Sequence, residues 1–201
     1  MFSGKRIVLG VTGGIAAYKA VEISRRLVDA GAHVSPIMTN AAKKFIGEVT
    51  LSALASEPVK SSLWNEEDPI PHTTLGQEAD LVLIVPATAK LIGTYAAGIS
   101  NDLLMATLLA TRAPVLICPA MHTEMWEHPA VQENLETLVR RGVRIVEPED
   151  GMLAGGDVGK GRLAGIEKIL DNAESVLAKN DLAGLKFLIT AGGTREPIDP
   201  V

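Results

Sequence analysis

The sequence predicts an α/β fold, with a doubly wound parallel sheet covered by helices on both faces. Short apolar runs that end at glycine or proline recur along the chain, as buried parallel strands do. Amphipathic segments of helical period separate these runs. The first run closes in Thr12-Gly13-Gly14 before a helix, which is how a Rossmann-like unit opens. We therefore expect a single domain over residues 1–180 and a separate segment over 181–201.

Composition indicates a compact soluble protein. Of its 201 residues, 47% are hydrophobic and 21% are charged, which suits a sizeable core. The formal net charge of -5 gives no electrostatic reason to expect nucleic acid or an anionic membrane as a partner. The single cysteine, Cys118, fits a reducing compartment. No apolar run approaches the roughly 20 residues of a membrane span, so we expect a cytoplasmic protein.

The first two strands are expected over residues 6–11 and 33–38. The helix between them would bury one regularly spaced face, made by Ala16, Ala20, Ile23, Leu27 and Ala30. Gly31 is suited to end that helix. Pro36 marks the second strand as an edge strand or an irregular one. A helix carrying Ala41, Phe45 and Val49 is expected next.

The glycine turn after the first strand lets backbone N–H groups approach a ligand at a helix N-terminus, where an anion is favoured. Because GVTGGIA lacks the G-x-G-x-x-G spacing and no acidic residue ends the second strand convincingly, a dinucleotide is disfavoured. A mononucleotide or a flavin phosphate remains open. Thr39 and Asn40 suit a helix cap and a phosphate contact equally well.

A loop is expected over residues 57–74, and His72 falls within it. A histidine in a loop is usually solvated, so its position alone does not indicate a role. Residues 79–85 make the clearest buried strand. Two helical pieces follow over residues 89–97 and 102–111.

The next strand, residues 115–118, ends at Pro119. Met121 and His122 follow it, at the edge where open α/β sheets bind ligands. The soft, polarisable Met121 side chain suits a flat aromatic ligand. Spacing alone also permits a plain loop into the next helix.

The last part of the domain is expected to hold a helix over residues 129–141, a short strand over 144–146 and a final helix over 166–179. Residues 150–165 hold six glycines and few large side chains, which predicts a mobile loop or flap. Residues 186–189 then begin a strand that runs into a second glycine turn, shortly before the sequence stops. Because a second unit of this kind begins and the sequence then stops, we expect a truncated second domain.

Several segments together resemble the flavin-containing cysteine decarboxylase family, which has a flavodoxin/Rossmann-like fold. Within that family they are most similar to the phosphopantothenoylcysteine decarboxylases of coenzyme A biosynthesis. The segments are VTGGIAAYK at 11–19, PIPHTTL at 69–75, PATAKLIGTYAAGISNDLL at 86–104, PAMHTEMW at 119–126 and GDVGKGRL at 156–163. The tail KFLITAGGTREPIDPV resembles the opening of the phosphopantothenate–cysteine ligases, whose half of the full-length protein would use CTP and Mg²⁺.

The resemblance implies an FMN enzyme that acts on 4′-phosphopantothenoylcysteine. In such enzymes the thiol-bearing carbon is oxidised to a thioaldehyde, carbon dioxide leaves, and the enethiolate is protonated and reduced to 4′-phosphopantetheine. The site of the family lies between subunits. A homo-oligomer is therefore implied, built from trimers and commonly a dodecamer.

The resemblance also implies roles for individual residues. His72 matches the histidine of the family and would act as acid and base. His122 stands where the family usually has an asparagine that holds the substrate carboxylate, and it would take that role. The cofactor contacts would be Gly13, Gly14, Ile15, Thr39, Thr88, Ala89, Ser100, Ala120 and Met121, with Thr39 and the glycine turn nearest the phosphate. The flap over the substrate would contribute Gly155, Asp157, Lys160 and Arg162.

Position 155 is the second departure from the family. The family flap usually carries a cysteine there, as the proton donor of the reductive half, and this chain has Gly155. Water, Lys160 or another flap group would have to replace it, or the reaction would stop at the oxidised enethiol. Alternative functions are a peptide cysteine decarboxylase, a flavin prenyltransferase, a non-catalytic FMN-binding regulatory subunit, or a nucleotide-binding module without redox chemistry. No metal ligand set is expected in the domain.

Overall fold

The protein is described here by a computed structural model that covers residues 2–64, 68–178, 185–186 and 188–192. Within these residues one parallel sheet has the strand order β2-β1-β3-β4-β5. Its strands are β1 Arg6–Val11, β2 His33–Met38, β3 Leu81–Ala87, β4 Val115–Pro119 and β5 Arg144–Ile145. The strand order reverses between β1 and β3, as in flavodoxin-like doubly wound folds. The predicted fold class is confirmed.

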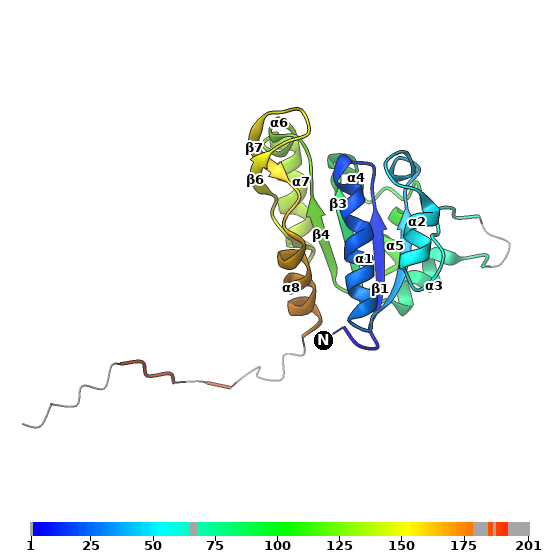
Figure 1. Cartoon of the computed structure of the whole chain (residues 1–201), viewed down its shortest axis with the longest axis horizontal. Helices are drawn as coiled ribbons and strands as arrows, with labels where there is room; N and C mark the ends of the chain where they lie inside the picture. Colours follow the sequence, from blue (N-terminus) through cyan, green and yellow to red (C-terminus); the bar gives the residue numbers. More distant parts are fainter. Residues whose placement is uncertain (1, 65–67, 179–184, 187, 193–201) are drawn as a thin grey trace, which may run out of the picture.

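Helices cover both faces of this sheet (Figure 1). The described helices are η1 Ile15–Tyr18, α1 Lys19–Asp29, η2 Ala42–Lys44, α2 Glu48–Leu54, α3 Pro71–Glu78, α4 Ala89–Ala96, α5 Leu103–Ala110, α6 Thr123–Trp126, α7 Pro129–Arg140 and α8 Ile166–Leu177. Helices α1 and α8 bury their apolar residues in one core, and α4, α5 and α7 bury theirs in the core on the other face. Strand β3 lies between the two cores and is buried at every position.

Most strands and the longer helices form where the apolar pattern predicts them. Gly31 ends the turn after α1 with φ +88°, in the left-handed region that favours glycine. Strand β2 is the edge of the sheet, which explains why Pro36 is tolerated there. Among the described helices, none is long and apolar enough to cross a membrane.

The prediction of one helix carrying Ala41, Phe45 and Val49 is wrong. The short segments η2 and α2 take its place, with Gly47 between them as the N-cap of α2. Phe45 and Val49 are 47% and 83% exposed, so their spacing does not report a buried face. His72 is also misplaced by the prediction, because α3 begins at Pro71 and puts His72 in its first turn.

The segment predicted as a mobile loop or flap is not an irregular loop but an antiparallel hairpin, formed by β6 Glu149–Met152 and β7 Val158–Arg162. The strand predicted over residues 186–189 is not formed at Lys186, Leu188 or Ile189. Phe187 and most of the glycine turn beyond it lie outside the described residues. The predicted second domain is therefore left untested.

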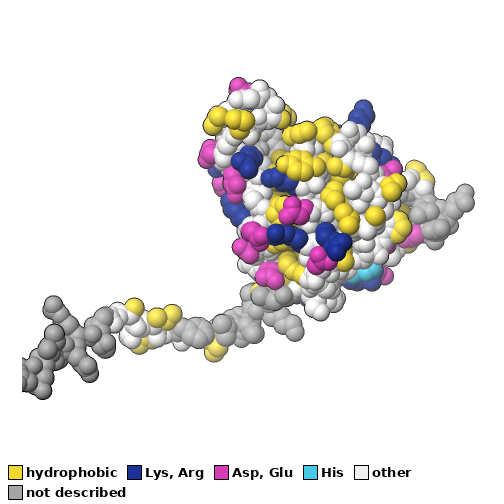
Figure 2. Space-filling view, in the orientation of Figure 1, with side chains coloured by type: hydrophobic (Ala, Val, Ile, Leu, Met, Phe, Trp, Pro, Cys, Tyr) yellow, Lys and Arg dark blue, Asp and Glu magenta, His cyan; other side chains and the backbone are white. Residues whose placement is uncertain are grey.

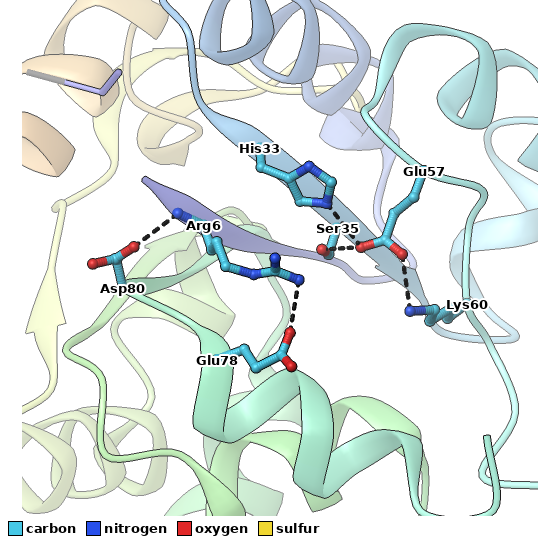
Figure 3. A network of polar contacts seen from close by, with 7 residues as sticks. All are labelled: Arg6, His33, Ser35, Glu57, Lys60, Glu78 and Asp80. Atoms are coloured by element: carbon cyan, nitrogen blue, oxygen red, sulfur yellow. Dashed lines mark hydrogen bonds and ion pairs between the residues drawn. The ribbon is translucent and has the colours of Figure 1, made fainter. Parts of the chain in front are cut away.

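Polar contacts fasten the amino-terminal ends of the central strands to their connections (Figure 3). The backbone N–H of Arg6 donates to Asp80 at 2.8 Å, and the Arg6 guanidinium lies 2.7 Å from Glu78 on α3. Beside β2, the Ser35 hydroxyl and Lys60 both donate to Glu57, the latter at 2.9 Å. These contacts lie away from the carboxyl edge of the sheet, where ligands are expected.

Candidate functional site

A cleft of about 420 Å³ opens at the carboxyl ends of β1, β2 and β3. This is the point where the strand order reverses, and its volume lies within the range of small-molecule sites, roughly 300–1,000 Å³. The cleft is lined by Thr12, Gly13, Met38, Thr39, Asn40, Ala41, Ser61, Thr88, Ala89, Lys90, Leu91, Thr94, Asn101, Asp102, Leu103, Leu104, Met105 and Met125.

Thr12 connects the strand ends that form the floor of the cleft. Its hydroxyl donates to the Pro86 carbonyl oxygen at 2.6 Å and accepts from the Thr88 N–H at 3.2 Å. The side chain is buried, so these bonds fix the end of β1 against the end of β3. Sequence reasoning missed Thr12, although its place between a buried strand and a glycine pair could have indicated it.

Gly13 allows two loops to meet at the cleft. A Cβ at this position would lie 2.4 Å from the Cβ of Ala41, closer than side chains can approach. The turn after β1 therefore packs directly against the turn after β2. Both turns present backbone to the cleft, as phosphate-binding turns do.

The hydroxyl groups in the cleft also cap helices. Thr39 accepts from the Ala42 N–H at 3.2 Å, and Thr88 accepts from the Leu91 N–H at 3.4 Å. The capping role that the sequence left open for Thr39 is thus present, and Thr39 lines the cleft as well. The charged residues of the lining are Lys90 and Asp102, and the Asp102 carboxylate caps α5 by accepting from the Met105 N–H at 2.8 Å.

His72 and Ser100 lie in a different place. They line a second, more open cleft of about 490 Å³ with Leu63, Trp64, Pro69, Ile70, Ala106, Leu109 and Ala110. Nδ1 of His72 is buried and has no hydrogen-bond partner in the described part of the chain. Its helix α3 lies at the opposite end of the molecule from α6, which carries the other predicted catalytic histidine at its N-terminus (Figure 1). A single chain does not bring the two histidines together.

That other histidine, His122, links two parts of the structure. Its Nδ1 contacts Glu124 in α6, and its Nε2 lies 3.0 Å from Oδ2 of Asp157 in the hairpin. The hydrogen bonds to Asp157 and then to Glu124 raise the pKa of His122 above its ordinary value. The imidazole is therefore biased toward its charged form while 39% of the side chain stays exposed.

The hairpin is held against the segment after β4 by close backbone contacts. The Met121 N–H donates to the Gly161 carbonyl oxygen at 3.0 Å. A Cβ at Gly161, where φ is +148°, would lie 2.1 Å from the Met121 carbonyl oxygen, and one at Gly159 would lie 2.3 Å from Oγ1 of Thr123. Glycine is required at both positions for this docking.

The hairpin also carries two basic side chains, Lys160 and Arg162. Lys160 lies 2.8 Å from Glu147, a contact that raises the pKa of Lys160, and its ammonium is 5.7 Å from the ring centre of Trp126. Arg162 lies near enough to Lys19 to lower the pKa of that lysine, although burial is the larger cause. At the exposed turn of the hairpin, Met152 and Val158 are 72% and 77% exposed, and Figure 2 shows hydrophobic atoms on this part of the surface.

The predicted cofactor residues divide into those in the first cleft and those outside its lining. Gly13, Thr39, Thr88 and Ala89 line the cleft. Ala120 is adjacent to it, because its N–H donates to the Ala87 carbonyl oxygen at 3.2 Å. The remaining predicted residues are outside the lining, namely Gly14, Ile15, Ser100 and Met121. In the described residues no group of three or more His, Cys, Asp or Glu side chains is placed to hold a metal ion.

A family model described as Flavoprotein matches residues 1–178 of the chain. Among curated proteins, the chain is 51% identical over 202 residues to the coenzyme A biosynthesis bifunctional protein CoaBC of Mycobacterium tuberculosis, covering 98% of this chain and 48% of that protein. It is 50% identical over 202 residues to the CoaBC of Escherichia coli, covering 99% and 50%. The chain thus spans about half the length of the curated relatives it matches.

Solved structures with the same fold include flavin enzymes. A mutant PPC decarboxylase in complex with pantothenoylaminoethenethiol matches with a TM-score of 0.78 and 27% identity, over 85% of this chain and 97% of that one. The FMN-dependent cysteine decarboxylase SpaF matches with a TM-score of 0.77 and 29% identity, over 89% and 100%. The FMN binding protein AtHal3 matches with a TM-score of 0.75 and 27% identity, over 85% and 95%.

Proposed function

The chain belongs to the Flavoprotein family, and from this we propose that it decarboxylates 4′-phosphopantothenoylcysteine to 4′-phosphopantetheine with FMN, in coenzyme A biosynthesis. The observation that carries the proposal is the cleft where the strand order of the sheet reverses. It occurs in a chain that is 51% identical, over 98% of its length, to a coenzyme A biosynthesis protein. The similarity to a PPC decarboxylase with a bound pantothenoyl compound supports the same substrate class.

The residues of the cleft fit FMN. Its volume of about 420 Å³ suits a mononucleotide-sized ligand, and Gly13 lets the turns after β1 and β2 pack together at its edge, because a Cβ there would lie 2.4 Å from that of Ala41. No side-chain cap occupies the N-terminus of η1 after that turn, so its N–H groups suit a phosphate, together with Thr39. Thr88, Ala89 and Met125 would border the flavin ring, with Gly14, Ile15, Ala120 and Met121 around them.

Bound FMN would supply the reversible two-electron oxidation of the thiol-bearing carbon of the substrate. The chain itself would hold the substrate beside it. His122, biased toward its charged form, would pair with the substrate carboxylate. The hairpin residues Gly155, Asp157, Lys160 and Arg162 would cover the substrate and exclude water.

His72 would act on the substrate of a neighbouring subunit. Its helix α3 lies well away from α6, whose N-cap is His122 (Figure 1), so a site that uses both histidines would require two copies of the chain. The surface around it is apolar, with Trp64 87% exposed and Ile70 53% exposed, as expected of a surface covered by a partner. This supports a homo-oligomer with sites between subunits. The proposed assembly, taken from the family resemblance, is built from trimers and reaches a dodecamer.

The subunit arrangement can be tested by mixing two variants at an FMN concentration that fills the wild-type cleft but leaves the cleft of Gly13→Ala mostly empty. Chains with His72→Gln keep an intact cleft, and chains with Gly13→Ala keep an intact His72. Mixed oligomers should recover turnover that neither variant has alone. If the site lies within one chain, mixing will restore nothing.

The longer relatives also suggest the wider setting. Because the chain spans about half of each CoaBC protein, the whole protein would also ligate cysteine to 4′-phosphopantothenate, using CTP and Mg²⁺ in the other half. Both reactions would take place in the cytoplasm on small soluble metabolites. Neither nucleic acid nor a membrane is a proposed partner.

The proposed substrate can be tested by offering two cysteine compounds to the FMN-loaded protein. We expect 4′-phosphopantothenoylcysteine to lose carbon dioxide, with 4′-phosphopantetheine identified by mass spectrometry. A peptide ending in cysteine should be left unchanged. Decarboxylation of the peptide alone would instead favour a peptide cysteine decarboxylase, the alternative that the likeness to SpaF keeps open. Bound FMN without turnover of either compound would indicate a non-catalytic FMN-binding protein.

A further inference from the structure

The proposed function, on which this inference rests, requires a proton to be added to a carbon atom of the substrate. Loss of carbon dioxide from the oxidised substrate leaves an enethiolate. Its α-carbon, which carried the carboxylate, must gain one proton before a hydride returns to the thiol-bearing carbon. The chain therefore has to place a proton donor beside the former position of the carboxylate.

Three groups near the hairpin or cleft are poor donors. Cys118 is fully buried in β4, and burial raises the pKa of its thiol above its usual range. Gly155 in the hairpin has no side-chain proton. Lys160 is paired with Glu147 at 2.8 Å, a contact that raises its pKa and so weakens it as a donor.

His122 has the required surroundings. A Cβ at position 155 would lie 3.1 Å from Oδ2 of Asp157 and 3.8 Å from Nε2 of His122, so with glycine there the Asp157 carboxylate is the group that borders this nitrogen. Glu124 contacts the opposite nitrogen, Nδ1, and can hold the ring in one orientation. Asp157 lies 3.0 Å from Nε2, and it is 66% exposed, so little packing opposes its displacement by a substrate.

The segment that carries His122 is joined to the cofactor cleft. The Ala120 N–H donates to the Ala87 carbonyl oxygen at 3.2 Å, and the next residue, Thr88, lines the cleft. Met125, one helical turn after His122, lines the same cleft. A substrate that extends from the cleft toward the hairpin would therefore meet Nε2 of His122.

We propose that His122 donates the proton of the reductive step. The Nε2–H bond breaks, and the electron pair of the enethiolate carbon–carbon double bond forms a new C–H bond at the α-carbon, which gives a thioaldehyde. A hydride, which the two-electron chemistry of bound FMN would supply, then adds to the thiol-bearing carbon and restores the thiolate, and solvent reprotonates the imidazole. Because the same imidazolium pairs with the carboxylate before carbon dioxide leaves, it already lies beside the carbon that needs the proton. Glu124 is a positioning residue in this scheme.

The test uses the FMN-loaded protein, with separate measurement of carbon dioxide and of the organic product. For His122→Gln we expect carbon dioxide release at a raised KM, with enethiol accumulating in place of most of the 4′-phosphopantetheine. His122→Ala should accumulate enethiol as well, and added imidazole should restore the reduced product, because the side chain is accessible. His128→Asn is the matched control, an exposed histidine nearby that caps α7, and it should give the wild-type product.

The outcomes separate this inference from the proposed function. No carbon dioxide from the wild type would overturn both. Carbon dioxide and fully reduced product from His122→Gln, in the wild-type ratio, would overturn the proton-donor role and leave the proposed function standing. Loss of carbon dioxide release in His122→Gln at saturating substrate, with no enethiol, would assign His122 to decarboxylation and would also overturn it. Folding of each variant is checked by its flavin content.

Discussion

Nε2 of His122 lies 3.0 Å from Oδ2 of Asp157, and this contact joins the loop after β4 to the β6–β7 hairpin. The two residues are 35 positions apart in the sequence. The contact gives the hairpin an electrostatic attachment in addition to its glycine-mediated backbone contacts with Met121 and Thr123. Part of the attachment of the hairpin therefore depends on the charge of one imidazole.

The charge of His122 should affect stability in a defined pH range. Asp157, followed by Glu124, raises its folded-state pKa above the ordinary value of 6.5. The resulting stabilisation is fully present below pH 6.5 and is lost as pH rises through the raised folded-state pKa. We expect the free energy of unfolding, measured in urea, to fall over that range. Asp157→Asn should lower the His122 pKa measured by NMR and reduce this fall, and an unchanged pKa would contradict the contact.

Glu57 should stabilise the edge of the sheet in a different pH range. Burial alone would raise its pKa, but hydrogen bonds from Ser35 and Lys60 outweigh that and lower it below the ordinary 4.5. Its stabilisation is present above pH 4.5 and is lost as pH falls through the lowered folded-state pKa. Glu57→Gln should cost about 1 kcal/mol at neutral pH, a value discounted for solvent exposure, and less in acid. The exposed Glu136→Gln is the control, and equal effects of the two variants would contradict this assignment.

The hairpin should not tolerate a side chain at Gly161. Alanine there would place a Cβ 2.1 Å from the Met121 carbonyl oxygen, so the strand must lift away, at about 1–3 kcal/mol. We expect faster amide exchange and proteolysis across residues 149–162 in Gly161→Ala. Gly165→Ala is a suitable control, because its Cβ would meet Glu149 at an ordinary 3.7 Å. Equal protection of the two variants would show that the hairpin is not docked in this way.

Gly13→Ala should weaken flavin binding at least about tenfold, equivalent to about 1.4 kcal/mol. Its Cβ would lie 2.4 Å from that of Ala41, so the two turns that border the cleft must separate. Flavin affinity can be measured by fluorescence quenching on titration of the apoprotein. Gly93→Ala in α4, whose Cβ has an ordinary 3.5 Å contact, should bind flavin as the wild type does. Wild-type affinity in Gly13→Ala would contradict the proposed phosphate site.

Most of the sheet could be predicted from the sequence because β1 to β4 are largely buried and so read as continuous apolar runs, unlike the short β5. The helix ends were also predictable where glycine takes a positive φ, as at Gly31 and Gly142. The hairpin could not be predicted in this way. Six glycines suggested mobility, whereas at least two of them exist so that β7 can approach Met121 and Thr123 closely, a requirement that only tertiary contacts reveal.

The candidate site was predictable only in part, for a related reason. Gly13, Thr39, Thr88 and Ala89 follow directly after strands, and the carboxyl ends of parallel strands meet at one edge of the sheet. Met125 and Lys90 lie within helices, where sequence position does not show which way a side chain faces. His72 was assigned from resemblance, and the position of its helix α3, well away from α6, could not be derived from spacing.

The central claim is tested most directly by adding 4′-phosphopantothenoylcysteine anaerobically to the purified FMN-loaded protein while its visible spectrum and the released carbon dioxide are recorded together. The account predicts one carbon dioxide released per substrate consumed, and a flavin spectrum that is oxidised again when the substrate is exhausted, because the reaction has no net redox change. A protein that binds no flavin, or one that binds flavin and releases no carbon dioxide, would contradict it.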